Sequence, residues 1–60
     1  LPDYRMVKEV GPSHNKVFHI EVAVRGEVLG YGDGKSKKEA QQNAAKMALE
    51  VLNEIDENGE

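Results

Sequence analysis

The sequence has no cysteine and no tryptophan, and its only aromatic residues are one phenylalanine and two tyrosines. Without cysteine it has neither a disulfide framework nor a thiolate metal site, which suits a reducing compartment. No apolar run approaches the ~20 residues that a membrane span needs, and the start lacks a signal-peptide pattern. The first residues are Leu1 and Pro2 instead of methionine, so we expect a fragment of a longer protein.

The length of 60 residues allows one small domain. A chain of this size buries only ~60% of the surface that its unfolded form exposes, so its stability is marginal. It is too short for a Rossmann domain, a barrel or a two-domain enzyme with a cleft.

The net charge of 8 − 11 = −3 is unevenly distributed along the chain. Residues 53–60 hold four acids and no base, which leaves 8 bases and 7 acids in residues 1–52. Three of the bases, Lys35, Lys37 and Lys38, fall within four positions. Charges separated by more than a Debye length of ~8–10 Å are screened from each other, so this local cluster matters more than the total.

The first 34 residues predict a three-stranded antiparallel meander. Residues 17–25 alternate between apolar and polar positions, as in a half-buried strand. Arg25 and Gly26 form a two-residue turn, so residues 27–31 should return as an antiparallel neighbour. Residues 4–10 predict the remaining strand, with Tyr4 and Met6 facing inward, and the turn-forming segment 11–15 ends it. Glycines then close the sheet and permit close backbone approaches, at Gly30, Gly32 and Gly34.

From Ser36 the apolar period changes to three and four residues, which predicts an amphipathic helix. Ser36 and Glu39 match an S-x-x-E capping box, so we place the N-cap at Ser36. The helix should fray after Leu52 or Asn53, which divides the chain into a domain of residues 1–53 and an acidic, disordered tail of residues 54–60. The apolar positions of the helix are Ala40, Ala44, Met47, Ala48, Val51, Leu52 and Ile55.

Three strands and one helix would leave apolar surface uncovered. Ala45, Leu49 and Leu52 widen the apolar stripe of the helix beyond what contact with one sheet requires. We therefore infer a missing element before Leu1, most simply another helix.

The lysine cluster lies at the end of the helix where positive charge is unfavourable. A helix N-terminus carries roughly half a positive charge, so a cation there costs ~0.3–1 kcal/mol. Lysines kept for solubility are one interpretation. Three lysines within four residues, beside free backbone N–H groups, favour another: a site for an anion.

Two anions are candidates for that site. Gly34-Lys35-Ser36 ends like a nucleotide-binding loop, but Leu29 stands where the first glycine of G-x-x-x-x-G-K-[ST] belongs, and the sheet is antiparallel. A phosphate backbone fits better, because lysines provide point charges that need little geometry. The chain offers no interleaved aromatic platform for stacking single-stranded bases, so a duplex is the favoured partner.

Taken together, these segments resemble the double-stranded RNA-binding domain, and most closely the domain that ends bacterial ribonuclease III. The resemblance covers residue 1 to about residue 52. It is specific, because a turn, a strand pattern and a helix start agree in order and spacing. The matching segments are Gly11-Pro12-Ser13-His14, Phe18-x-Ile20-x-Val22-x-Val24, Gly30-x-Gly32-x-Gly34-Lys35-Ser36-Lys37-Lys38-Glu39-Ala40, and Ala44-Ala45-x-x-Ala48-Leu49.

The resemblance implies an α+β fold, α-β-β-β-α, in which this chain lacks the first helix. It implies that the loop Gly11, Pro12, Ser13, His14 enters the minor groove of RNA and touches 2′-hydroxyls. Lys37 and Lys38, helped by Lys35, would bind phosphates across the major groove. Without the resemblance, the loop is simply a good turn, and Ser36 and Glu39 are explained as a cap.

The resemblance also implies that this chain is not the catalyst and holds no catalytic residue, metal or cofactor. The magnesium-dependent endoribonuclease domain, with its carboxylates, would lie elsewhere in the parent protein. That parent would be a cytoplasmic homodimer that processes duplex RNA, ribosomal RNA included, with no membrane partner. His14 and His19 have no second ligand at metal spacing. A protein–protein interaction module on the same fold is the alternative, and the uncovered helix stripe would suit it.

Overall fold

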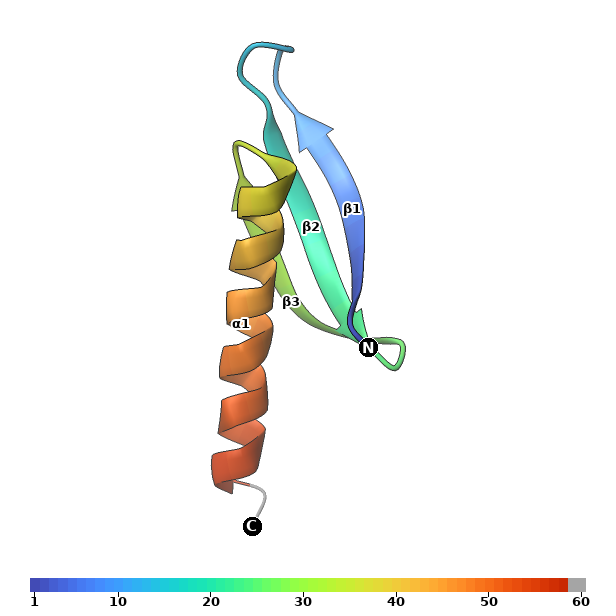
Figure 1. The fold of residues 1–60 in the computed structure, drawn as a ribbon, viewed down its shortest axis with the longest axis vertical. Helices are drawn as coiled ribbons and strands as arrows, with labels where there is room; N and C mark the ends of the chain where they lie inside the picture. The colour runs from blue at the N-terminus through green and yellow to red at the C-terminus, as the bar shows by residue number, and fades with distance from the viewer. Residues whose placement is uncertain (59–60) are drawn as a thin grey trace.

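The structure is a computed structural model that describes residues 1–58, with side chains described through Glu54. Three strands, β1 (Asp3–Val10), β2 (Val17–Val24) and β3 (Glu27–Gly34), precede one helix, α1 (Lys37–Asn58). The strands form one antiparallel sheet in the order β1-β2-β3, and α1 lies across β2 and β3 (Figure 1). The predicted meander followed by a helix is therefore confirmed.

The tight hairpin between β2 and β3 follows from its turn residues. Arg25 and Gly26 both have positive φ, at 54° and 82°, between the paired ends Val24 and Glu27. Two consecutive positive φ values are the signature of a type I′ turn, whose twist matches that of the flanking strands. Glycine adopts this conformation without strain, and its place in the turn fixes the register of both strands.

The core lies between β2 and the helix, and it is built mainly from small side chains. Ile20 and Val22 project from β2 onto the helix, as the alternation in the sequence predicts. Phe18 and Leu29 pack against this cluster while remaining half-buried. Among the helix residues whose side chains are described, those buried in the core are all alanines, namely Ala40, Ala44 and Ala48.

The three buried glycines of β3 lie directly beneath those alanines. A Cβ atom added to Gly32 would be 2.2 Å from the carbonyl oxygen of Ala40 and 2.2 Å from the amide nitrogen of Ala44. Alternate strand residues are about 6.6–6.8 Å apart. Helix residues four positions apart are separated by about 6.0 Å along the helix axis. Because the two spacings are similar, each glycine of the strand lies opposite an alanine of the helix. The prediction of a close approach is confirmed, but the glycines do not end the strand after Tyr31, because β3 continues through Gly34.

The helix leaves β1 uncovered. Tyr4 and Met6 pair with Val22 and Ile20, so they face the same side of the sheet as the core. The prediction that they face inward is confirmed, but they remain 38% and 42% exposed because the helix does not cover them. An apolar groove lies beside them, lined by Pro2, Tyr4, Val22, Val24, Ala45, Ala48, Leu49 and Leu52. The helix inferred to precede Leu1 stays a prediction.

The helix continues through Asn58, further than the predicted fraying after Leu52 or Asn53. Residues 54–58 contain neither proline nor glycine, so local propensity does not oppose the helix there. The expected tail is therefore helical over its described part, while Gly59 and Glu60 lie outside the described residues. No helix in the described part of the chain is long and apolar enough to cross a membrane.

Candidate nucleic-acid interface

The N-cap at Ser36 is confirmed by its hydrogen bonds. Its hydroxyl oxygen accepts from the N–H of Glu39 at 3.1 Å, and its carbonyl oxygen accepts from the N–H of Ala40 at 3.0 Å. The Glu39 carboxylate accepts from the N–H of Lys35 at 3.4 Å, one residue before the partner expected in a capping box. The cap therefore fixes where the helix begins and places Lys37 and Lys38 in its first turn.

The three clustered lysines are exposed. Among the side chains of residues 1–54, no carboxylate oxygen comes within 4.0 Å of the ammonium nitrogen of Lys35, Lys37 or Lys38. Arg5 contacts Glu21 at 2.6 Å and Lys16 contacts Glu9 at 2.8 Å, whereas Lys8, Arg25 and Lys46 also have no ion pair among the described side chains. The end of the helix where the macrodipole is positive therefore carries three lysines with no carboxylate at ion-pair distance among the described side chains.

Contacts with β3 hold this end of the helix in place. A Cβ atom on Gly34 would be 2.6 Å from the amide nitrogen of Ala40, so the first turn rests on the strand backbone. One turn later, the side-chain amide of Asn43 donates to the carbonyl oxygen of Asp33 at 2.7 Å. The lysines therefore project from a fixed support, and only their own side chains need to be ordered when an anion binds.

The loop between β1 and β2 has a defined shape. The N–H of Asn15 donates to the carbonyl oxygen of Pro12 at 2.9 Å, which closes a β-turn over residues 12–15. Gly11 has a φ of +106°, and a Cβ atom there would be 2.5 Å from the carbonyl oxygen of Asn15. Only glycine fits this position, so Ser13 and His14 are presented on an exposed and ordered turn.

The fold brings the loop and the lysines to the same end of the molecule. In Figure 1 the loop between β1 and β2 and the start of α1 lie at the top, opposite the β2–β3 turn. The register agrees, because Phe18, close to the loop, pairs with Gly34, close to the helix start. Every site residue predicted from the sequence is therefore in one region, namely Gly11, Pro12, Ser13, His14, Lys35, Lys37 and Lys38.

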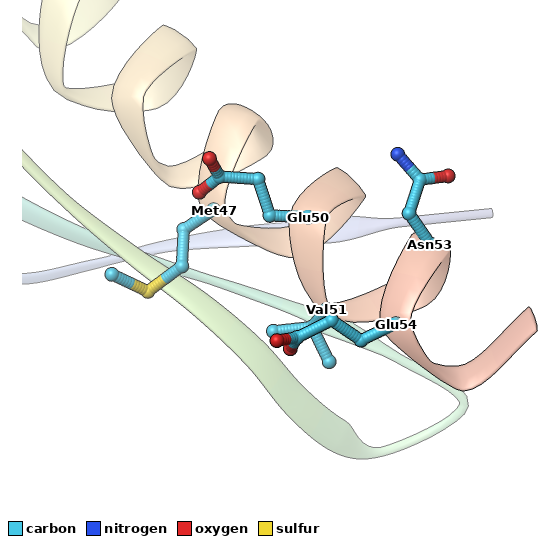
Figure 2. A pocket seen from close by; sticks show the side chains of 5 residues that line it. All are labelled: Met47, Glu50, Val51, Asn53 and Glu54. Atoms are coloured by element: carbon cyan, nitrogen blue, oxygen red, sulfur yellow. The ribbon is translucent and has the colours of Figure 1, made fainter. Parts of the chain in front are cut away.

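Toward the C-terminal end of α1, the described charged side chains are acidic instead of basic. A shallow pocket there is lined by Met47, Glu50, Val51, Asn53 and Glu54, and it contains two carboxylates and no base (Figure 2). Phosphates are repelled by such a surface. The electrostatics of the helix thus direct an anionic partner to its N-terminal end.

Sequence reasoning missed the side-chain contacts between strands. The Nδ1 atom of His19 lies 2.8 Å from the Oδ1 atom of Asp33. The two residues are directly paired across β2 and β3, so the hairpin register was the signal that could have shown this contact. No group of three histidine, cysteine or acidic residues in the described part of the chain could hold a metal ion.

Comparisons with known proteins agree with this geometry. A family model described as "Double-stranded RNA binding motif" matches residues 1–52. Proteins named Ribonuclease 3 are also similar. The protein from Natranaerobius thermophilus is 57% identical over 51 residues, which is 85% of this chain and 22% of that protein. The protein from Geobacillus kaustophilus is 53% identical over 55 residues, which is 92% of this chain and 22% of that protein.

This chain therefore spans about a fifth of the length of the curated relatives it matches. The family match extends from the first residue through the strands, the loop and the lysine cluster to Leu52. The chain belongs to the double-stranded RNA binding motif family.

Proposed function

We propose that this chain binds double-stranded RNA through the shape of the A-form helix and its phosphates, with little preference for sequence. The observation that carries the proposal is the placement of an ordered turn and three lysines, which form no ion pair with the side chains of residues 1–54, at one end of the molecule. Its membership of the double-stranded RNA binding motif family supports the same partner.

Each part of the interface has a distinct role in this proposal. The turn at Pro12, Ser13 and His14 enters the wide, shallow minor groove, where 2′-hydroxyls distinguish RNA from DNA. Lys37 and Lys38, with Lys35 beside them, bind phosphates on both sides of the neighbouring major groove. Lysine suits this role, because phosphate binding needs charge more than a fixed donor geometry.

In the whole protein, we propose that this domain is the substrate-binding module of a ribonuclease III. The relatives named Ribonuclease 3 are several times longer than this chain, which leaves room for a nuclease domain elsewhere. Magnesium and the catalytic carboxylates would belong to that domain, and this chain would position the duplex for cleavage. A cytoplasmic homodimer that processes RNA is the corresponding proposal for the parent.

The salt dependence of binding tests the electrostatic part of the proposal. If three to four phosphates are engaged, a plot of log affinity against log salt concentration should have a slope of about −3. Fluorescence anisotropy with a labelled RNA duplex measures this slope. The titrations cover roughly 50–300 mM KCl, the range in which counterion release is measurable. A flat response would remove the phosphate-binding role of the lysines.

A further inference from the structure

An acidic residue lies beside the lysine-rich end of the domain. Glu9 pairs with Phe18 across β1 and β2, and Phe18 pairs with Gly34 across β2 and β3. These three residues form one row across the sheet, and the first turn of α1 rests on Gly34. Because directly paired residues share a face, Glu9 projects on the helix side of the sheet. Two strand spacings, about 10 Å in total, separate the backbone of Glu9 from that of Gly34.

Glu9 is held by a lysine from the end of the β1–β2 loop. The ammonium nitrogen of Lys16 is 2.8 Å from the Glu9 carboxylate, and the two side chains are 36% and 41% exposed. The hydrogen bond from Lys16 holds the pKa of Glu9 below its usual value, and the charges of Lys16 and Lys37 lower it further. The carboxylate is therefore ionised at neutral pH and lies within the field of two lysines from different elements.

This arrangement matters for a phosphate-binding surface. Lys16 follows the turn of the loop directly, so its ammonium group belongs to the same end as Lys35, Lys37 and Lys38. A lysine paired with a carboxylate has part of its charge neutralised, and the carboxylate also repels nearby phosphates. An exposed ion pair of this kind is weak, so a phosphate can compete for the lysine.

We propose that Lys16 is a further phosphate-binding residue of this surface and that Glu9 is an internal competitor that restrains its affinity for duplex RNA. The inference rests on the proposed function of the chain. In the free protein the ammonium group of Lys16 is paired with the Glu9 carboxylate. In the complex a phosphate of the duplex replaces the Glu9 carboxylate as the partner of Lys16. The charge of Glu9 is then unpaired and repels the duplex, which limits how much the Lys16 contact adds to the affinity.

The variant Glu9→Gln tests this directly, because it keeps the shape of the side chain and removes its charge. Duplex RNA affinity should rise about three- to tenfold at 150 mM salt, while the log–log slope should stay nearly the same, because Lys16 binds a phosphate in both complexes. Glu27→Gln is the matched control. It makes the same charge change at an exposed residue beside the β2–β3 turn, at the opposite end of the sheet, and should leave affinity nearly unchanged.

Lys16→Gln separates a direct contact from a general field effect. If Lys16 binds phosphate, Lys16→Gln should weaken binding, and Glu9→Gln in that background should lose most of its gain. The inference is overturned if Glu9→Gln binds like wild type, binds more weakly, or gains no more than Glu27→Gln. It is also overturned if the gain persists without Lys16. In each of these cases wild-type binding to duplex RNA stays intact, whereas a wild-type chain that does not bind duplex RNA defeats the proposed function and this inference together.

Discussion

Replacing both Lys37 and Lys38 by alanine is expected to weaken duplex RNA binding by about ten- to a hundredfold, or roughly 1.4–2.8 kcal/mol. Two phosphate contacts are removed, so the log–log salt slope should become shallower by about 1.8. The stability of the domain should not fall, because both lysines oppose the helix dipole and form no ion pair among the described residues. Removing Lys38 should stabilise the helix by about 0.3–1 kcal/mol, and removing Lys37 should stabilise it by less, because Lys37 also attracts Glu9.

The opposite signs of the two effects make this variant informative. Anisotropy titrations with an RNA duplex measure the loss of affinity, and urea unfolding followed by circular dichroism measures stability. The matched control is Lys8→Ala with Lys46→Ala, which removes two exposed bases that also lack an ion pair in the described part of the chain. This control should lose much less affinity. Equal losses of affinity in the two double variants would mean that the cluster acts only through the net charge of the chain. Unchanged affinity in both would favour the protein-interaction alternative.

Gly32→Ala is expected to be the most destabilising single-methyl substitution in the sheet. The added Cβ would be 2.2 Å from two backbone atoms of the helix, the carbonyl oxygen of Ala40 and the amide nitrogen of Ala44. Neither atom belongs to a side chain that can rotate away, so the whole helix must shift. Overpacking costs about 1–3 kcal/mol and sometimes more, and we expect at least the upper end of that range. A 60-residue domain has only about 3–9 kcal/mol of stability in total, so a large share is lost.

Gly26→Ala serves as the control for Gly32→Ala. A Cβ atom at Gly26 would meet nothing within 4 Å, but the residue has a φ of +82°. Its substitution therefore reports backbone strain without a clash, at a cost of about 1–2 kcal/mol. Urea unfolding of both variants compares the two costs. If Gly32→Ala proves as stable as wild type, or less affected than Gly26→Ala, the close packing of β3 against the helix does not hold the domain together.

The local features of this fold could be predicted from the sequence because each depends on neighbouring residues. The hairpin follows from Arg25 and Gly26, and the helix start follows from Ser36 and Glu39. The common location of the loop and the lysines also follows, because in an antiparallel meander the first turn and the end of the third strand lie at the same edge. That topology, more than any single residue, made the candidate site predictable.

Features that depend on contacts distant in sequence could not be predicted. Glycine favours the end of a strand, so β3 was expected to stop after Tyr31. Only the alanines of the helix, at Ala40, Ala44 and Ala48, explain why Gly32 and Gly34 lie within the strand. The pairing of Lys16 with Glu9 depends on the path of the loop between them, which residue spacing alone does not specify.

The most direct test of the central claim is a competition between nucleic acids for this end of the domain. A labelled RNA duplex bound to the protein is challenged with equal concentrations of unlabelled duplex RNA, duplex DNA of the same sequence, and single-stranded RNA. If the loop at Ser13 and His14 reads the minor groove while the lysines bind phosphates, duplex RNA should displace the probe at least tenfold more effectively than either competitor, a preference of about 1.4 kcal/mol. Equal displacement by duplex DNA would contradict the account, because a surface that binds phosphates alone does not distinguish the two duplexes.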